Sequence, residues 1–195
     1  MSLHLPSFFP LRAGRVHEVC GAASTGFAAI AAAVAGARAL WVQEAWLVDM
    51  LIPEGMMPFI EPANLLLART QNQIDTLAVA EEALKDGSLP VVVLEVTRPL
   101  YLREGRRLQL AARAGQTTGL CIIPEGMGSN ATETRWRAGP VYDPARDDST
   151  LMRWEIIKNK SGTTGGLHVF WNAQTHRLHV VPPVGERPGS AQRPE

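Results

Sequence analysis

The sequence predicts an α/β fold with a doubly wound, mostly parallel sheet and a C-terminal antiparallel extension. Up to residue 123, segments with the period of a strand alternate with segments with the period of a helix, which is typical of such a sheet. Residues 89–96 (LPVVVLEV) form a continuous apolar run, as expected for a strand buried at the centre of a parallel sheet. After residue 130 the pattern changes to short alternating strands, which favours hairpins.

The individual elements follow from local pattern and from glycine and proline positions. Gly36 and Gly87 are expected to end the helices before them. The first strand is expected to end at Cys20-Gly21, before a loop over residues 22–26. The strands are expected at 15–19, 39–42, 65–67, 89–96, 118–123, 134–141, 153–160, 167–171 and 178–181. The helices are expected at 27–35, 71–86 and 102–114, with a broken helix and loop over 43–62.

The size predicts one domain, residues 1–181, followed by a proline-containing tail, 182–195, that we expect to be disordered. On the helix at 71–86 we expect Ile74, Leu77, Ala78 and Leu84 to form the buried side.

The composition points to a soluble cytoplasmic protein. The chain has 195 residues, 46% of them hydrophobic, and its 19 basic and 19 acidic side chains cancel. This balance argues against a protein that coats nucleic acid or an anionic membrane. Two cysteines do not make a disulfide framework, and we expect no signal peptide and no transmembrane segment.

A phosphate-binding loop is suggested by the spacing Gly21 to Gly26 between the first strand and the first helix. Such a loop, which here also contains Ser24 and Thr25, cradles phosphates with its backbone N–H groups. The next two residues should be lysine and serine or threonine, which neutralise phosphate and hold Mg²⁺. They are Phe27 and Ala28, so the sequence predicts a degenerate loop. An ordinary strand–helix turn with two glycines remains the alternative.

Two acidic positions could complete a remnant nucleotide site. Glu95 ends the apolar strand where a P-loop ATPase places its Walker B carboxylate, and Gln43-Glu44 ends the second strand. Ligands bind doubly wound sheets at this carboxyl edge. We expect no metal site and no cofactor.

The chain resembles the RecA family, and within it the ImuA proteins. The similarity extends over roughly residues 12–181. It rests on residues 14–19 leading into 21–26, on 91–95, and on 154–160 with their Lys-Asn-Lys ending, while 14–19 and 39–42 (ALWV) resemble ImuA proteins in particular. Short connections at residues 97–102 and 125–130 depart from RecA, which places its DNA-binding loops there.

The resemblance implies a non-catalytic RecA-like protein that binds other components of SOS-induced mutagenic translesion synthesis in the DNA damage response. The implied partners are an ImuB-like Y-family protein, with RecA and a C-family error-prone polymerase as further candidates. One alternative is a SulA-like inhibitor of cell division. The other is a RecA-like ATPase that receives Lys158 and Lys160 from a neighbouring subunit.

Two surfaces are candidates for these contacts. The first is a basic face made by Arg98, Arg103, Arg106 and Arg107, which suits an acidic partner or a weak contact with DNA, although a solvated helix face is the alternative. The second is an apolar docking segment that contains Trp46, Met50, Met56, Met57 and Phe59, for which core packing is the alternative.

Overall fold

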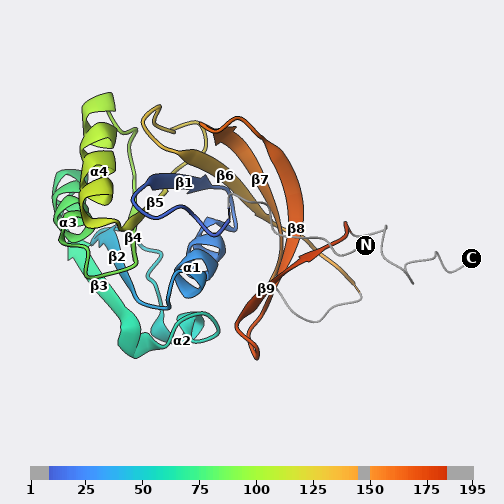
Figure 1. Cartoon of the computed structure of the whole chain (residues 1–195). Coiled ribbons are helices and arrows are strands. Elements are labelled where there is room, and N and C mark those ends of the chain that lie inside the picture. The colour runs from blue at the N-terminus through green and yellow to red at the C-terminus, as the bar shows by residue number, and fades with distance from the viewer. Residues whose placement is uncertain (1–8, 145–149, 184–195) are drawn as a thin grey trace, which may run out of the picture.

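The computed structural model describes residues 9–144 and 150–183 (Figure 1). Within these residues the strands are β1 Val16–Cys20, β2 Ala39–Glu44, β3 Leu65–Thr70, β4 Val91–Glu95, β5 Thr118–Ile122, β6 Thr134–Pro140, β7 Leu151–Asn159, β8 Gly165–Asn172 and β9 Arg177–Val181. The helices are α1 Ser24–Val34, α2 Pro53–Met56, the 3-10 turn η1 Pro62–Asn64, α3 Gln73–Asp86 and α4 Leu102–Gly115.

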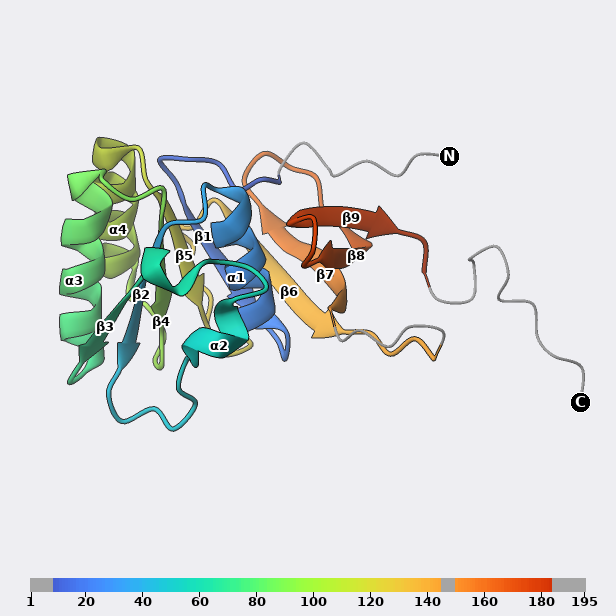
Figure 2. The same cartoon turned by 90° about the horizontal axis from the view of Figure 1, so that it is seen from below.

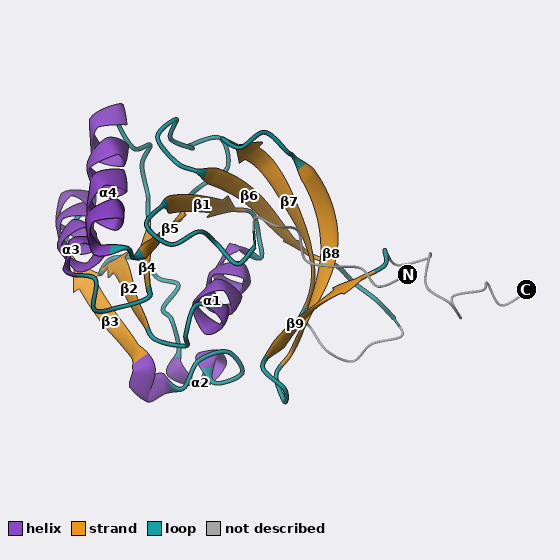
Figure 3. Cartoon of the chain, in the orientation of Figure 1, coloured by secondary structure: helices purple, strands orange, loops and turns teal. Residues whose placement is uncertain are grey.

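The described strands form a single mixed sheet with the order β3-β2-β4-β5-β1-β6-β7-β8-β9. Neighbours from β3 to β6 are parallel, and the pairs from β6 to β9 are antiparallel. Figure 3 shows the antiparallel strands curving away from the plane of the parallel ones. The predicted α/β class, with a mostly parallel sheet and an antiparallel C-terminal part, is confirmed.

Helices cover both faces of the parallel strands (Figure 2). Helices α3 and α4 lie on one face, where Leu84 and Leu108 pack against strand residues such as Val92. Helix α1 lies on the other face, between the parallel strands and the curved β7–β9 part. The core around α1 therefore receives side chains from both parts of the sheet, among them Trp154 and Trp171.

Helix α3 begins and ends where its capping residues dictate, but its buried side differs from the prediction. The Asn72 side chain accepts a hydrogen bond from the Asp75 N–H, and Gly87 ends the helix with φ +78°. Ile74, expected in the core, is 70% exposed, whereas Gln73 and Thr76 are buried. The helix is rotated because these polar side chains form hydrogen bonds at the ends of β3 and β4.

Strand β6, expected in the antiparallel extension, joins the two parts of the sheet. It pairs antiparallel with β7, but Arg135 to Arg137 of β6 pair in parallel with Glu18 to Cys20 of β1, so the strand direction changes between β6 and β7. Alternating side chains indicate a strand but carry no information about its direction. Among the described residues no helix is long and apolar enough to cross a membrane. Most of the expected tail, 184–195, lies outside the described residues.

Candidate functional site

The turn between β1 and α1 is shorter than the predicted loop. Helix α1 begins at Ser24, so Ser24, Thr25 and Gly26 form its first turn and not the end of a loop. Gly21 has φ +96°, and a Cβ at this position would lie 2.4 Å from the Ala138 carbonyl oxygen. The Ala23 N–H donates to the same oxygen at 3.0 Å. The turn is therefore packed against β6, which uses one of the N–H groups that a phosphate would need.

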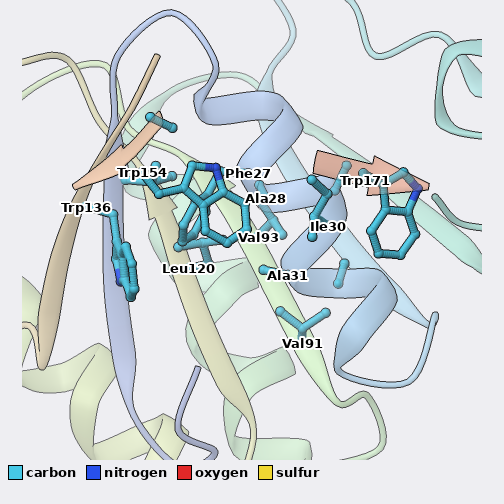
Figure 4. Close-up of a cluster of buried hydrophobic side chains, with 14 of the residues drawn as sticks. Phe27, Ala28, Ile30, Ala31, Val91, Val93, Leu120, Trp136, Trp154 and Trp171 are labelled. Carbon is cyan, nitrogen blue, oxygen red and sulfur yellow. The ribbon is translucent and has the colours of Figure 1, made fainter. Parts of the chain in front are cut away.

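Phe27 occupies the position expected for the phosphate-binding lysine, and its ring is buried in the core. Figure 4 shows the ring beside Trp154, with Trp136 next to them. The ring centroids lie 4.5 Å from Trp154, 5.3 Å from Trp136 and 6.0 Å from Phe9. Aromatic contacts of this kind stabilise a core beyond simple area burial. Position 27 therefore serves the fold and offers no charge to a ligand.

The two predicted carboxylates lie on neighbouring strands at the carboxyl edge of the sheet. Glu95 ends β4 and accepts a hydrogen bond from Trp41 Nε1 at 2.8 Å, and burial raises the pKa of this carboxyl group. Glu44 ends β2, is buried, and accepts from Trp46 Nε1 at 2.7 Å and from the Thr97 hydroxyl. Both carboxylates accept hydrogen bonds from side chains of this chain, and those of Glu44 fix the loops that follow β2 and β4 at the sheet edge.

The Glu44 contact belongs to a polar network that sequence reasoning missed. The Gln73 side-chain oxygen accepts hydrogen bonds from the Thr97 and Arg98 N–H groups at 2.9 and 2.8 Å, and its amide donates to the Arg98 carbonyl. Thr97 connects this amide to Glu44. The network binds the end of β2, the end of β4 and the start of α3 together. No sequence pattern distinguishes such a buried glutamine from an exposed one.

The four arginines of the predicted basic face do not act as one surface. Arg98 pairs with Glu104 at 3.0 Å and lies over the Tyr101 ring, and Arg107 pairs with Glu81 of α3 at 2.6 Å. Arg103 and Arg106 are both exposed on α4, and of these two only Arg106 lines the groove between α4 and the segment 130–133. Half of the predicted charge is thus neutralised locally.

The predicted apolar docking segment is divided between surface and core. Trp46 and Met57 are 61% and 58% exposed, as the docking interpretation requires. Met56 is buried in the core, and Phe59 is half-buried and stacked on Trp171 at 5.8 Å, so the docking prediction is wrong for Met56. The helical turn of α2 separates the two methionines, placing one inward and the next outward.

Met50 of the predicted docking segment is 60% exposed, and two more exposed apolar residues near Trp46 were missing from the prediction: Val48 and Ile52. They are 92% and 62% exposed, and with Met50 they lie between β2 and α2. Together with Trp46 they occupy every second position of the segment between β2 and α2. The sequence gives no period-two signal for this, because Leu47 and Leu51, which lie between them, are also apolar. We define Trp46, Val48, Met50, Ile52 and Met57 as the apolar connector.

Comparison with known proteins supplies the family. No protein-family model matches the sequence. Two curated proteins named Protein ImuA, from two strains of Caulobacter vibrioides, are each 30% identical to the chain over 147 residues, covering 67% of this chain. The chain belongs to the ImuA family. It spans 59% of the length of these ImuA relatives.

In this ImuA-family chain, Lys158 and Lys160, which the ATPase alternative would have contact the nucleotide of a neighbouring subunit, form hydrogen bonds within their own chain. Lys158 Nζ donates to the carbonyls of Ser129, Asn130 and Thr132 at 3.0 to 3.1 Å. Lys160 Nζ donates to the Ala131 carbonyl at 2.6 Å. Both ammonium groups therefore hold the segment that precedes β6, which weighs against the ATPase alternative.

A buried histidine of β1, His17, is a candidate source of pH-dependent stability in this ImuA-family chain. His17 Nε2 lies 3.1 Å from the Arg12 carbonyl, so it carries the proton, and Nδ1 lies 2.7 Å from the Thr134 hydroxyl. Burial lowers the pKa of His17 from 6.5 to about 4. The unfolded chain therefore binds a proton between these two pH values that the folded chain excludes, so folding stability falls as the pH drops through this window.

We expect the free energy of unfolding to fall by up to about 3 kcal/mol as the pH drops from about 7 to about 4, because of His17. The measurement is urea denaturation of the wild-type chain and of His17→Gln across this range. Glutamine carries no titrating proton, so the variant should be less stable at neutral pH but should lose less stability on acidification. Equal pH dependence in the two proteins would show that other groups are responsible.

Proposed function

We propose that this chain is a non-catalytic, cytoplasmic component of SOS-induced mutagenic translesion DNA synthesis that acts by binding another protein of that system. Membership of the ImuA family supports the DNA damage role over the SulA-like alternative. The burial of Phe27 and the internal contacts of Lys158 and Lys160 support a role without ATP hydrolysis.

The observation that carries the proposal is the apolar connector. Isolated exposed apolar residues are common, but five of them within 12 residues on one connection form a surface that water solvates poorly. A tryptophan and two methionines in such a segment resemble the anchors that dominate the binding energy of protein interfaces. We propose an ImuB-like Y-family protein as the partner, with RecA and a C-family error-prone polymerase as additional components.

Co-purification with an ImuB-like protein tests this proposal. Trp46→Ala should weaken binding by roughly 2 kcal/mol, about 30-fold, if it is an anchor. Val48→Asp should also weaken binding, because it places a charge in the apolar contact with the partner. It should not destabilise the free chain, because the Val48 side chain is almost fully exposed to water there.

Tyr142→Ala is the matched control, since Tyr142 is an aromatic side chain that is 84% exposed outside the connector. Binding by Tyr142→Ala should equal that of the intact chain. Val48→Asp and Tyr142→Ala should unfold at the same urea concentration as the intact chain, whereas Trp46→Ala should unfold at a lower one, because it removes the Nε1 hydrogen bond to buried Glu44. Recovery of the partner by Trp46→Ala and Val48→Asp in full would exclude the connector. No recovery by the intact chain would contradict the proposed partner.

A further inference from the structure

A basic groove lies between helix α4 and the segment 130–133 that leads into β6. Its volume is about 610 Å³. Four cationic side chains line it, Arg15, Arg106, Arg113 and Lys160, against one carboxylate, Glu133. It shares no residue with the apolar connector, so it is a separate surface.

Two of the four cationic side chains, Arg106 and Arg113, form no ion pair within the described part of the chain. Arg15 Nε lies 3.5 Å from Glu133, and Lys160 is held by the Ala131 carbonyl. Arg106 and Arg113 are exposed, and no described acidic group pairs with either guanidinium. The groove therefore presents two arginines that can bind carboxylates with paired hydrogen bonds.

The same groove also exposes apolar surface. Leu102 and Leu110 line it and are 51% and 68% exposed. With Arg106 they lie four residues apart on α4, so the three side chains form one stripe along the helix. The floor is fixed, because the Gln109 amide donates to the Val16 and Ala131 carbonyls, both at 3.1 Å.

We propose that this groove binds an acidic amphipathic peptide segment of another protein. Apolar side chains of the segment pack on Leu102 and Leu110, and its carboxylates pair with Arg106 and Arg113. The lining favours a peptide over single-stranded nucleic acid for a physical reason. No aromatic side chain lines the groove to stack on bases, and two exposed leucines offer nothing to a phosphate backbone.

The test measures the fluorescence anisotropy of a labelled synthetic helical peptide of about 15 residues, with leucines four residues apart and glutamates flanking them. The intact chain should bind this peptide, and a matched peptide with glutamine in place of glutamate should bind at least about tenfold more weakly, because the arginines lose their charged partners. Labelled oligothymidylate tests the nucleic-acid alternative.

Charge reversal of Arg106 and Arg113 together, R106E/R113E, should weaken peptide binding at least about tenfold. The single variants Arg106→Glu and Arg113→Glu should each weaken binding too, and Arg103→Glu is their matched control: it reverses one charge on the same helix outside the groove and should change binding less than about twofold. Leu110→Ser should weaken binding without changing its dependence on salt.

Urea midpoints equal to that of the intact chain show that the variants fold. Failure of the intact chain to bind the glutamate peptide would overturn the proposal. So would equal losses in Arg103→Glu and in the double variant. Oligothymidylate that binds more tightly than the peptide and is released by the double variant would assign the groove to nucleic acid instead.

Discussion

Phe27→Lys is expected to destabilise the folded chain by about 4 kcal/mol or more and to create no affinity for MgATP, although it restores the residue type of a P-loop. The substitution removes a ring that is fully buried among Phe9, Trp136 and Trp154. It places an ammonium group in the same apolar space, whose described lining consists of hydrophobic side chains that cannot pair with it. Adding Ala28→Thr should not help, because Ala28 is also buried against the core.

The unfolding of this variant is followed by urea denaturation, and nucleotide binding by isothermal titration calorimetry. Thr25→Lys is the matched control, because it adds the same charge in the same helical turn at an exposed position. It should cost less than about 1 kcal/mol, mainly through repulsion at the helix N-terminus. Phe27→Leu keeps an apolar side chain and should fall between the two. Wild-type stability of Phe27→Lys together with micromolar, Mg²⁺-dependent ATP binding would show that side chain 27 can turn toward the loop.

The same residue shows how far sequence reasoning reaches in this chain. The loss of lysine at position 27 is visible in the sequence, and it correctly indicates that no cation stands there. The place of the ring is not visible, because it depends on β7, more than 100 residues later, curving over α1 to bring Trp154 to Phe27. The early start of α1 at Ser24 also depends on a contact that is distant in the sequence. The Ala138 carbonyl of β6 accepts a hydrogen bond from the Ala23 N–H and packs closely against Gly21.

Elements with strong local signals were predicted well. The run that contains β4 is apolar on both sides, and α3 has Asn72 and Gly87 at its ends, so both positions follow from short-range physics. The buried side of α3 did not follow, because apolar periodicity assumes that polar residues face water. Gln73 and Thr76 break that assumption by forming hydrogen bonds with Thr97, Arg98 and Thr70.

The candidate surfaces were likewise predictable where they depend on local sequence and not where they depend on tertiary contacts. Composition alone indicates that the segment 46–59 is rich in apolar residues, and it is the turn of α2 that decides which methionine is exposed. The arginines were visible as a cluster, but their pairing was not: Arg107 pairs with Glu81 of α3, and Arg98, which precedes α4, pairs with Glu104 in the first turn of α4. The basic groove needs Arg15 and Lys160, which are 145 positions apart in the sequence and meet only through the β1–β6–β7 pairing.

The segment beside that groove is anchored by a buried ion pair. Glu18 of β1 is fully buried, and its carboxylate accepts hydrogen bonds from Arg135 Nε at 2.7 Å, the Ser129 N–H at 2.8 Å and the Thr132 hydroxyl at 3.1 Å. Arg135 lies across Gly128, where a Cβ would overlap the guanidinium. Glu18 thus connects β1, the segment 128–132 and β6.

Glu18→Ala is expected to destabilise the folded chain by about 3 to 5 kcal/mol, because the mostly buried Arg135 guanidinium and the Ser129 N–H lose their partner together. Removing both charges, as in Glu18→Ala with Arg135→Met, should cost less than the sum of the two single changes, since no unpaired charge then remains inside.

A double-mutant cycle by urea denaturation measures this difference, and we expect a coupling energy of about 2 kcal/mol or more. Arg137→Met is the matched control, because Arg137 lies on the same strand as Arg135 and pairs with exposed Glu125, and an exposed pair contributes at most about 1 kcal/mol. Additive losses from Glu18→Ala and Arg135→Met would show that the two residues stabilise the chain independently. In that case the segment 128–132 would be held by Lys158 and not by the ion pair.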